Sequence, residues 1–193
     1  MSRYKELETR LERTEQQLRV FQSISRMMVR NMSLGEILHE TVQLVGEFMQ
    51  CDSCLMYLMD RDDLVLCASN PPHPGNIGKV RLKINEGLTG WVAGQRRLLA
   101  ISREAFNDPR FKYFSDLPED TYHGFLSAPI IARDRVVGVI NVQHRMPHMH
   151  TGAELELLHT VAEQVGCLLV LSRMPEDAVE EANHVELVLS SLQ

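Results

Sequence analysis

Two matching motifs, one on each side of the apolar middle of the chain, constrain the fold most. Ser33 is followed three residues later by Glu36, and Thr151 three residues later by Glu154. In such a capping box the hydroxyl accepts a backbone N–H of the first helical turn, and the carboxylate reaches back to the cap residue. Each motif therefore predicts the start of a helix. The side chains predicted to face the core are Ile37, Leu38, Val42, Val45 and Phe48 in the first helix, and Leu155, Leu158, Val161, Val165 and Leu168 in the second.

Six apolar runs of strand length lie between these two helices. The polar breaks at residues 60–63 and 133–135 are short enough to be hairpin turns, which join antiparallel strands. The pattern predicts an α+β fold with one central antiparallel sheet, helices packed on one face, and the long segment 86–125 over the other face. The predicted strands span residues 54–59, 64–68, 80–84, 98–101, 125–131 and 136–142.

Residues 85–95 interrupt the strand pattern with three glycines and the only tryptophan of the chain. They predict a tight turn at Gly87 and Gly90 that enters a short helix capped by Gly94. Seven of the eleven aromatic residues lie between Trp91 and Phe125. An aromatic cluster beside polar groups is typical of a small-molecule pocket, although a satellite hydrophobic cluster that only holds the loop carries equal weight. The candidate ligand-binding residues are Thr89, Trp91, Arg110, Phe111, Tyr113, Tyr122, His123, Phe125 and Ser127.

Arg110 has two open roles: it holds an anion, or it forms an ion pair with Asp108 or Asp116. Catalytic signals are weak, because the chain has no glycine-rich phosphate loop, no sheltered carboxylate pair and no nucleophile elbow. We therefore predict no catalytic residue, and the sequence indicates no particular cofactor.

The remaining candidates for reactive or metal-binding groups are cysteines and histidines. Cys51 and Cys54 have the spacing of a redox or zinc pair, but the chain has no second pair, and all four cysteines (Cys51, Cys54, Cys67 and Cys167) lie in or beside apolar segments. Buried structural thiols are the favoured interpretation. The histidine-rich loop with His144, His148 and His150 could bind a transition metal. Pro147 and the helix cap after it favour an exposed connector, so we predict no metal site.

The N-terminal 28 residues carry a stripe of positions that alternate by three and four, which is the seam of a coiled coil. It predicts a homodimer, with packing of the same stripe on its own domain as the alternative. The stripe consists of Tyr4, Leu7, Leu11, Thr14, Leu18, Phe21, Ser25 and Met28.

Charge and hydropathy exclude several classes of function. The net charge is −6, and residues 174–193 alone carry five acidic residues and no Lys or Arg. No basic face is large enough for nucleic-acid binding. No apolar run is long enough to span a bilayer or to form a signal peptide, so we expect a cytoplasmic protein without membrane insertion. The acidic segment 174–193 is open to two interpretations, a short extra helix or a disordered tail.

Residues 33–172 resemble a GAF domain. Within that family, the stretches 108–114 and 122–126 resemble the sensory domain at the N-terminus of the nitrogen-related phosphotransferase enzyme I. The resemblance implies a small-molecule pocket on the sheet face opposite the terminal helices, and helical ends that dimerise and signal to a downstream partner. It divides the chain into an N-terminal helix (1–32), a GAF domain (33–173) and the acidic tail (174–193). The stretches that carry the family resemblance are 86–93, 127–130, 136–143 and 154–171.

The sequence lacks motifs of several GAF subfamilies, which narrows the range of functions that the resemblance implies. The Asn-Lys-Phe-Asp-Glu constellation of cyclic-nucleotide-binding phosphodiesterase domains and the bilin-attaching cysteine of phytochromes are both absent from this sequence. The phosphohistidine and phosphoenolpyruvate regions of enzyme I are absent as well. The leading hypothesis is a non-enzymatic sensory module that binds an unidentified small molecule. The alternatives are a thiol-dependent free methionine sulfoxide reductase and a dimerisation platform without a ligand.

Overall fold

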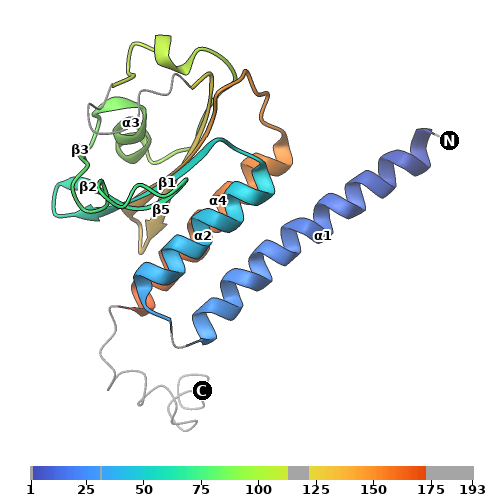
Figure 1. Ribbon diagram of the computed structural model, residues 1–193, viewed down its shortest axis with the longest axis horizontal. Helices are drawn as coiled ribbons and strands as arrows, with labels where there is room; N and C mark the ends of the chain where they lie inside the picture. The colour runs from blue at the N-terminus through green and yellow to red at the C-terminus, as the bar shows by residue number, and fades with distance from the viewer. Residues whose placement is uncertain (1, 31, 113–121, 173–193) are drawn as a thin grey trace, which may run out of the picture.

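The computed structural model describes residues 2–30, 32–112 and 122–172 (Figure 1). Tyr113 of the predicted pocket and the acidic tail lie outside the described residues. The elements are four α-helices, six strands and one 3-10 helix. In chain order they are α1 (Ser2–Val29), α2 (Leu34–Met49), β1 (Ser53–Asp60), β2 (Asp63–Asn70), β3 (Arg81–Lys83), α3 (Gly87–Gln95), β4 (Leu99–Ile101), η1 (Ala105–Asn107), β5 (Gly124–Ala132), β6 (Arg135–His144) and α4 (Gly152–Leu171).

The strands form one antiparallel sheet in the order β3-β2-β1-β6-β5-β4. Both predicted hairpins are confirmed, because Asp60 pairs with Asp63 and Ala132 pairs with Arg135. Arg133 and Asp134 both adopt positive φ, 46° and 61°. This is the backbone conformation that a two-residue turn needs to follow the twist of an antiparallel pair.

Helices α2 and α4 pack side by side on one face of the sheet, as predicted (Figure 1). Both capping boxes are formed, with Ser33 and Thr151 accepting the backbone N–H of Glu36 and Glu154. Side chains on β1 alternate between the two faces. Cys54 and Met56 join the core under α2 and α4, whereas Leu55 and Tyr57 join a second core under α3. The sheet is therefore covered on both faces, and the predicted α+β architecture is confirmed.

The turn into α3 differs from the prediction at two glycines, because Gly90 lies within the helix instead of in the turn and Gly94 does not cap it. Gly87 adopts φ +65°, which confirms the turn. A Cβ on Gly90 would lie 2.3 Å from the Lys83 carbonyl oxygen, and one on Gly94 would lie 2.0 Å from Asn85 Oδ1. The predicted cap at Gly94 is wrong, because Arg96 occupies the left-handed C-cap position with φ 56°. Gly94 is instead a position where the helix approaches the Asn85 side chain, which would have to shift to admit a Cβ.

Helix α1 is attached to the domain by its second half only. Val20, Ile24 and Met27 are buried against the domain, and Ile24 is only 1% exposed. The first half extends away from α2 and α4 in Figure 1. Its large apolar side chains are exposed, at 77% for Tyr4, 57% for Leu7 and 60% for Leu11. The predicted coiled-coil seam is thus exposed at Tyr4, Leu7, Leu11 and Leu18, whereas Phe21 of the same seam packs against the core beside Val20 and Ile24.

Candidate functional site

Six of the described candidate pocket residues are brought together on the sheet face that α3 covers, namely Thr89, Trp91, Arg110, Phe111, Phe125 and Ser127. Thr89 and Trp91 lie on α3, and Phe125 and Ser127 lie on β5. Arg110 and Phe111 follow η1, in the segment that passes over the start of α3. A Cβ built on Gly87 would lie 3.2 Å from the Lys112 Cβ, which shows how closely this segment approaches the helix.

A chain of buried hydrogen bonds connects α3 to the sheet. Ser127 Oγ donates to Asn141 Oδ1 over 2.7 Å, and Asn141 Nδ2 donates to Thr89 Oγ1 over 2.7 Å. The exposed fraction is 0% for Ser127, 1% for Asn141 and 8% for Thr89. Buried polar groups stabilise a fold only when they are paired, so the three side chains form one interdependent network. Asn141 is not among the predicted site residues, although an asparagine at an inward position of an apolar strand could have indicated it.

An apolar cluster lies next to this network. Leu88 of α3, Ala105 of η1 and Phe125 of β5 are buried together, with Phe111 packed against them. Phe125 and Ser127 lie two residues apart on β5 and therefore share a face of the sheet. Apolar and polar groups thus adjoin on one surface, which is the composition of a small-molecule site.

Two polar contacts hold segment 108–112 against α3. Arg110 donates to both carboxylate oxygens of Asp108, at 2.8 and 2.7 Å, and its guanidinium lies 4.4 Å from the centre of the Trp91 ring. Hydrogen bonds from Arg110 hold the pKa of Asp108 below its usual value. Lys112 forms an ion pair with Glu86, the N-cap residue of α3. Of the two open roles of Arg110, the structure shows the ion pair with Asp108. We call these contacts, Asp108–Arg110–Trp91 and Lys112–Glu86, the clasp.

His123 lies away from the Thr89 network, at the end of the sheet. Its ring packs edge-on against Phe106 with centroids 5.1 Å apart, and its backbone N–H donates to the His144 carbonyl. Tyr122, the residue before it, is half-buried. The structure therefore places His123 beside the histidine-rich loop, just before the Gly124–His144 pair, which is three residue pairs along the β5–β6 ladder from Ser127.

The histidines of that loop converge on one another. His144 is 6% exposed, and its ring stacks on His148 at 3.9 Å, with the His150 ring 5.5 Å from His144. Burial lowers the pKa of His150 to about 4, with His148 and His144 adding to the effect, and it also lowers the pKa of His144. The loop is exposed at Arg145, Met146, Pro147 and Met149, as predicted, whereas His144 is buried and His148 and His150 are half-buried.

Three of the four cysteines match the prediction of buried structural thiols, whereas it is wrong for Cys167, which is exposed on α4. Burial raises the pKa of Cys51 to about 11, and burial also raises those of Cys54 and Cys67. Cys54 belongs to the core on the α2 and α4 side, and Cys51 and Cys67 pack against that same core. None of these three thiols therefore faces the α3 side of the sheet.

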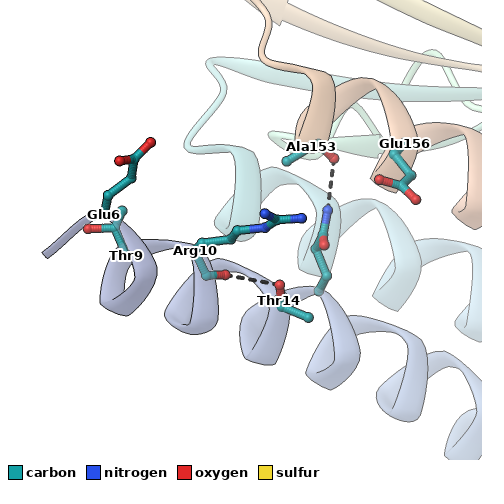
Figure 2. Close-up of a pocket in the computed structure, with 7 residues that line it drawn as sticks. Glu6, Thr9, Arg10, Thr14, Ala153 and Glu156 are labelled. Carbon is teal, nitrogen blue, oxygen red and sulfur yellow. Dashed lines mark hydrogen bonds between the residues drawn. The ribbon is translucent and has the colours of Figure 1, made fainter. Parts of the chain in front are cut away.

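A hollow that the sequence did not predict lies between α1 and the first turn of α4 (Figure 2). It has a volume of about 590 Å³. Gln17 closes one end by donating to the Ala153 carbonyl over 2.9 Å. The hollow is the space left where α1 separates from the domain. Its lining is mostly polar and consists of Glu6, Thr9, Arg10, Thr14, Gln17, Ala153 and Glu156.

The sheet order, the helices on one face and α3 over the other define a known domain class. The GAF domain family matches residues 33–169. This chain therefore belongs to the GAF domain family. Among the helices that the structure describes, none is long and apolar enough to cross a membrane.

Within the family, the chain is similar to GAF domains of phosphoenolpyruvate-protein phosphotransferases. The one from Coxiella burnetii is 26% identical, with a TM-score of 0.76 over 82% of this chain and 95% of that chain. The one from Acinetobacter is 28% identical, with a TM-score of 0.73 over 81% and 93%. A phosphoenolpyruvate-dependent phosphotransferase system protein of Escherichia coli is 29% identical over 73% of this chain. The chain spans only 19% of that protein's length.

The same fold also occurs in an enzyme. The free methionine-R-sulfoxide reductase of Neisseria meningitidis, solved with its substrate, has a TM-score of 0.67 at 17% identity, over 80% of this chain and 88% of that chain. At that identity the likeness concerns the fold alone.

Proposed function

We propose that this chain is a regulatory sensory module that binds a small polar molecule between α3 and the sheet. The observation that carries the proposal is the buried network of Thr89, Asn141 and Ser127, which adjoins an apolar cluster and lies beside the clasp. Family membership and the similarity to phosphotransferase GAF domains support a sensory role.

The network indicates the class of ligand. Within the network Thr89 Oγ1 only accepts, so its hydroxyl hydrogen is not used. Asn141 Nδ2 uses one of its two hydrogens. Both groups could donate to a ligand, so the site suits a molecule with a carbonyl or carboxylate oxygen. An amino acid or a 2-oxo acid fits this requirement better than a purely apolar molecule does.

The clasp is the element through which binding would change the protein. Its contacts are partly exposed, with the Arg110 side chain at 34% and the Lys112 side chain at 41%. Partly exposed ion pairs contribute little, about 0–1 kcal/mol each. A ligand that contacts segment 108–112 could therefore shift the clasp between closed and open arrangements by its different affinity for the two.

The test is a screen of amino acids, 2-oxo acids and cyclic nucleotides by thermal unfolding and by fluorescence of Trp91, the only tryptophan. A ligand at 100 times its Kd stabilises the protein by about 2.7 kcal/mol. We expect a carboxylate ligand to raise the melting temperature and change Trp91 emission, and Arg110→Ala to weaken both effects. Arg81→Ala is the matched control, because it removes an exposed arginine ion pair on β3. If no compound changes either signal, ligand sensing loses its support.

We further propose that two copies of the chain pair through α1. The side chains of Tyr4, Leu7, Leu11 and Leu18 are 53–77% exposed, at the three- and four-residue spacing of a coiled-coil seam. The separate stripe of Val20, Ile24 and Met27 attaches the same helix to the domain. This arrangement leaves the first part of the seam, from Tyr4 to Leu18, available for a second copy, and a coiled coil is the partner that such a spacing fits. Relay to a downstream protein would then pass through the paired helices.

Sedimentation of the full chain tests this dimer. Leu11→Lys places a charge in the seam and should convert dimer to monomer at micromolar concentration. Glu12→Lys, one residue further at an exposed position outside the seam, should leave the dimer intact. If the wild type is a monomer, the proposed dimer does not form. If the Leu11→Lys variant remains a dimer, the contact between the two copies lies outside the seam.

We propose that the module is not an enzyme. A thiol-dependent reductase needs a thiolate at its substrate site, whereas the pKa values of Cys51, Cys54 and Cys67 are raised by burial. Turnover of free methionine sulfoxide by the intact protein, lost on Cys54→Ser or Cys67→Ser, would contradict this part of the proposal.

A further inference from the structure

We propose that His144, His148 and His150 form a binding site for a divalent transition-metal ion, for which zinc is the appropriate probe. One ring nitrogen from each of the three histidines lies within 4.8 Å of the other two. His144 ends β6, and the other two lie in the connector to α4. The site is separate from the Thr89 network and does not depend on the sensory function proposed above.

Unpaired nitrogens in a buried setting point to a missing partner. His144 Nε2 and both ring nitrogens of His150 are buried and make no hydrogen bond of good geometry, and His144 as a whole is 6% exposed. Buried polar atoms are normally paired, and an unpaired one reduces stability. A metal ion bound by these nitrogens would supply the partner. Neutral imidazole is also the form in which histidine binds metals.

The distances are close to those of a zinc site. A tetrahedral ion with Zn–N bonds of about 2.0–2.1 Å separates its nitrogen ligands by about 3.3 Å. The rings therefore need to approach one another by about 1.5 Å at most, a shift that side-chain torsions can provide.

Hydrogen bonds hold the backbone around the site in place. The histidine rings can therefore turn about their side-chain torsions while the loop backbone keeps its position. The His148 N–H donates to the Ser102 carbonyl over 2.9 Å, and the His144 carbonyl accepts the His123 N–H over 2.9 Å. Gly124 allows the close approach of β5, because a Cβ there would lie 3.1 Å from the His144 Cβ and 3.2 Å from the His148 Cβ.

Glu154 acts as the orienting partner of one ligand. Its Oε1 lies 2.8 Å from His148 Nε2, and its Oε2 accepts the Thr151 N–H in the capping box. A carboxylate that accepts from one ring nitrogen of a histidine orients the ring and leaves the lone pair of the other nitrogen for a metal. Glu154 therefore links the site to the first turn of α4.

Three imidazole nitrogens favour zinc, nickel or copper over magnesium or calcium, because magnesium and calcium prefer oxygen ligands. No thiolate takes part in the site. Three histidines leave a fourth coordination position open for water. A bound ion would join the connector before α4 to the end of β6 at His144, which pairs with Gly124 at the start of β5.

The test is thermal unfolding of the full chain, freed of metal by a chelator, with zinc added. At a free zinc concentration 100 times the Kd, we expect the melting temperature to rise by about 5–10 °C. His150→Gln should abolish the rise. His159→Gln, an exposed histidine on α4, is the control and should respond as the wild type does. If His150→Gln lowers stability by itself, His148→Gln provides a second variant.

Cobalt absorption and a change at Glu154 identify the ligands. Cobalt in place of zinc should give the visible bands of a tetrahedral nitrogen site, without a thiolate charge-transfer band, at one ion per chain. Glu154→Gln can keep the capping box and should weaken binding by about 10-fold or more. Equal zinc responses of wild type and both histidine variants, a thiolate band, or no response at any zinc concentration would each overturn the proposal.

Discussion

Replacement of Thr89 by valine tests whether the buried network stabilises this fold as a unit. Valine has nearly the shape of threonine but lacks the oxygen that accepts from Asn141 Nδ2 over 2.7 Å. Asn141 is 1% exposed, so the amide N–H that loses its acceptor stays buried. Leaving such a donor unpaired costs about 1–3 kcal/mol. For a chain of this length the melting temperature should fall by about 2–12 °C.

The assay is urea unfolding of Thr89→Val, of Ser127→Ala and of the double variant. Both single changes remove a partner of Asn141, so their effects should be non-additive by at least about 0.5 kcal/mol. Thr160→Val is the matched control, because the Thr160 hydroxyl is exposed and bonds only to the Glu156 carbonyl of its own helix. Its effect should stay within about 0.5 kcal/mol. A loss that small for Thr89→Val, or strict additivity, would refute the reasoning.

Two further predictions concern a close packing contact and thiol reactivity. Gly90→Ala should destabilise the protein by about 2 kcal/mol or more, because the new Cβ would lie 2.3 Å from a backbone oxygen; Gly35→Ala, where nothing lies within 4 Å, should be neutral or stabilising in the same unfolding assay. Iodoacetamide at pH 8 should label the exposed Cys167 first, as mass spectrometry would show. The pKa of Cys51 is about 11, so its labelling should rise about 10-fold per pH unit between pH 8 and 10. Rapid labelling of Cys51 at pH 8 would contradict its burial.

The clearest sequence signals were local ones. Capping boxes and apolar periodicity involve neighbouring residues, so Ser33, Thr151 and the six apolar runs indicated the helices and strands directly. The hairpin turns followed from the shortness of the polar breaks. The face of the sheet predicted for the candidate pocket came from the resemblance to GAF domains, not from a local pattern.

Contacts between distant residues were decided by the tertiary structure alone. Thr89 and Asn141 are 52 positions apart, and no local pattern pairs them. Arg110 had two acidic neighbours in sequence, and only the turn after η1 selects Asp108. On α1 two stripes have helical spacing, and the docking of Ile24 determines which one is buried. The histidine-rich loop has the composition of an exposed connector, yet the curl of its backbone toward β5 buries His144. Sequence determines what each segment forms, whereas burial and pairing depend on which segments meet in space.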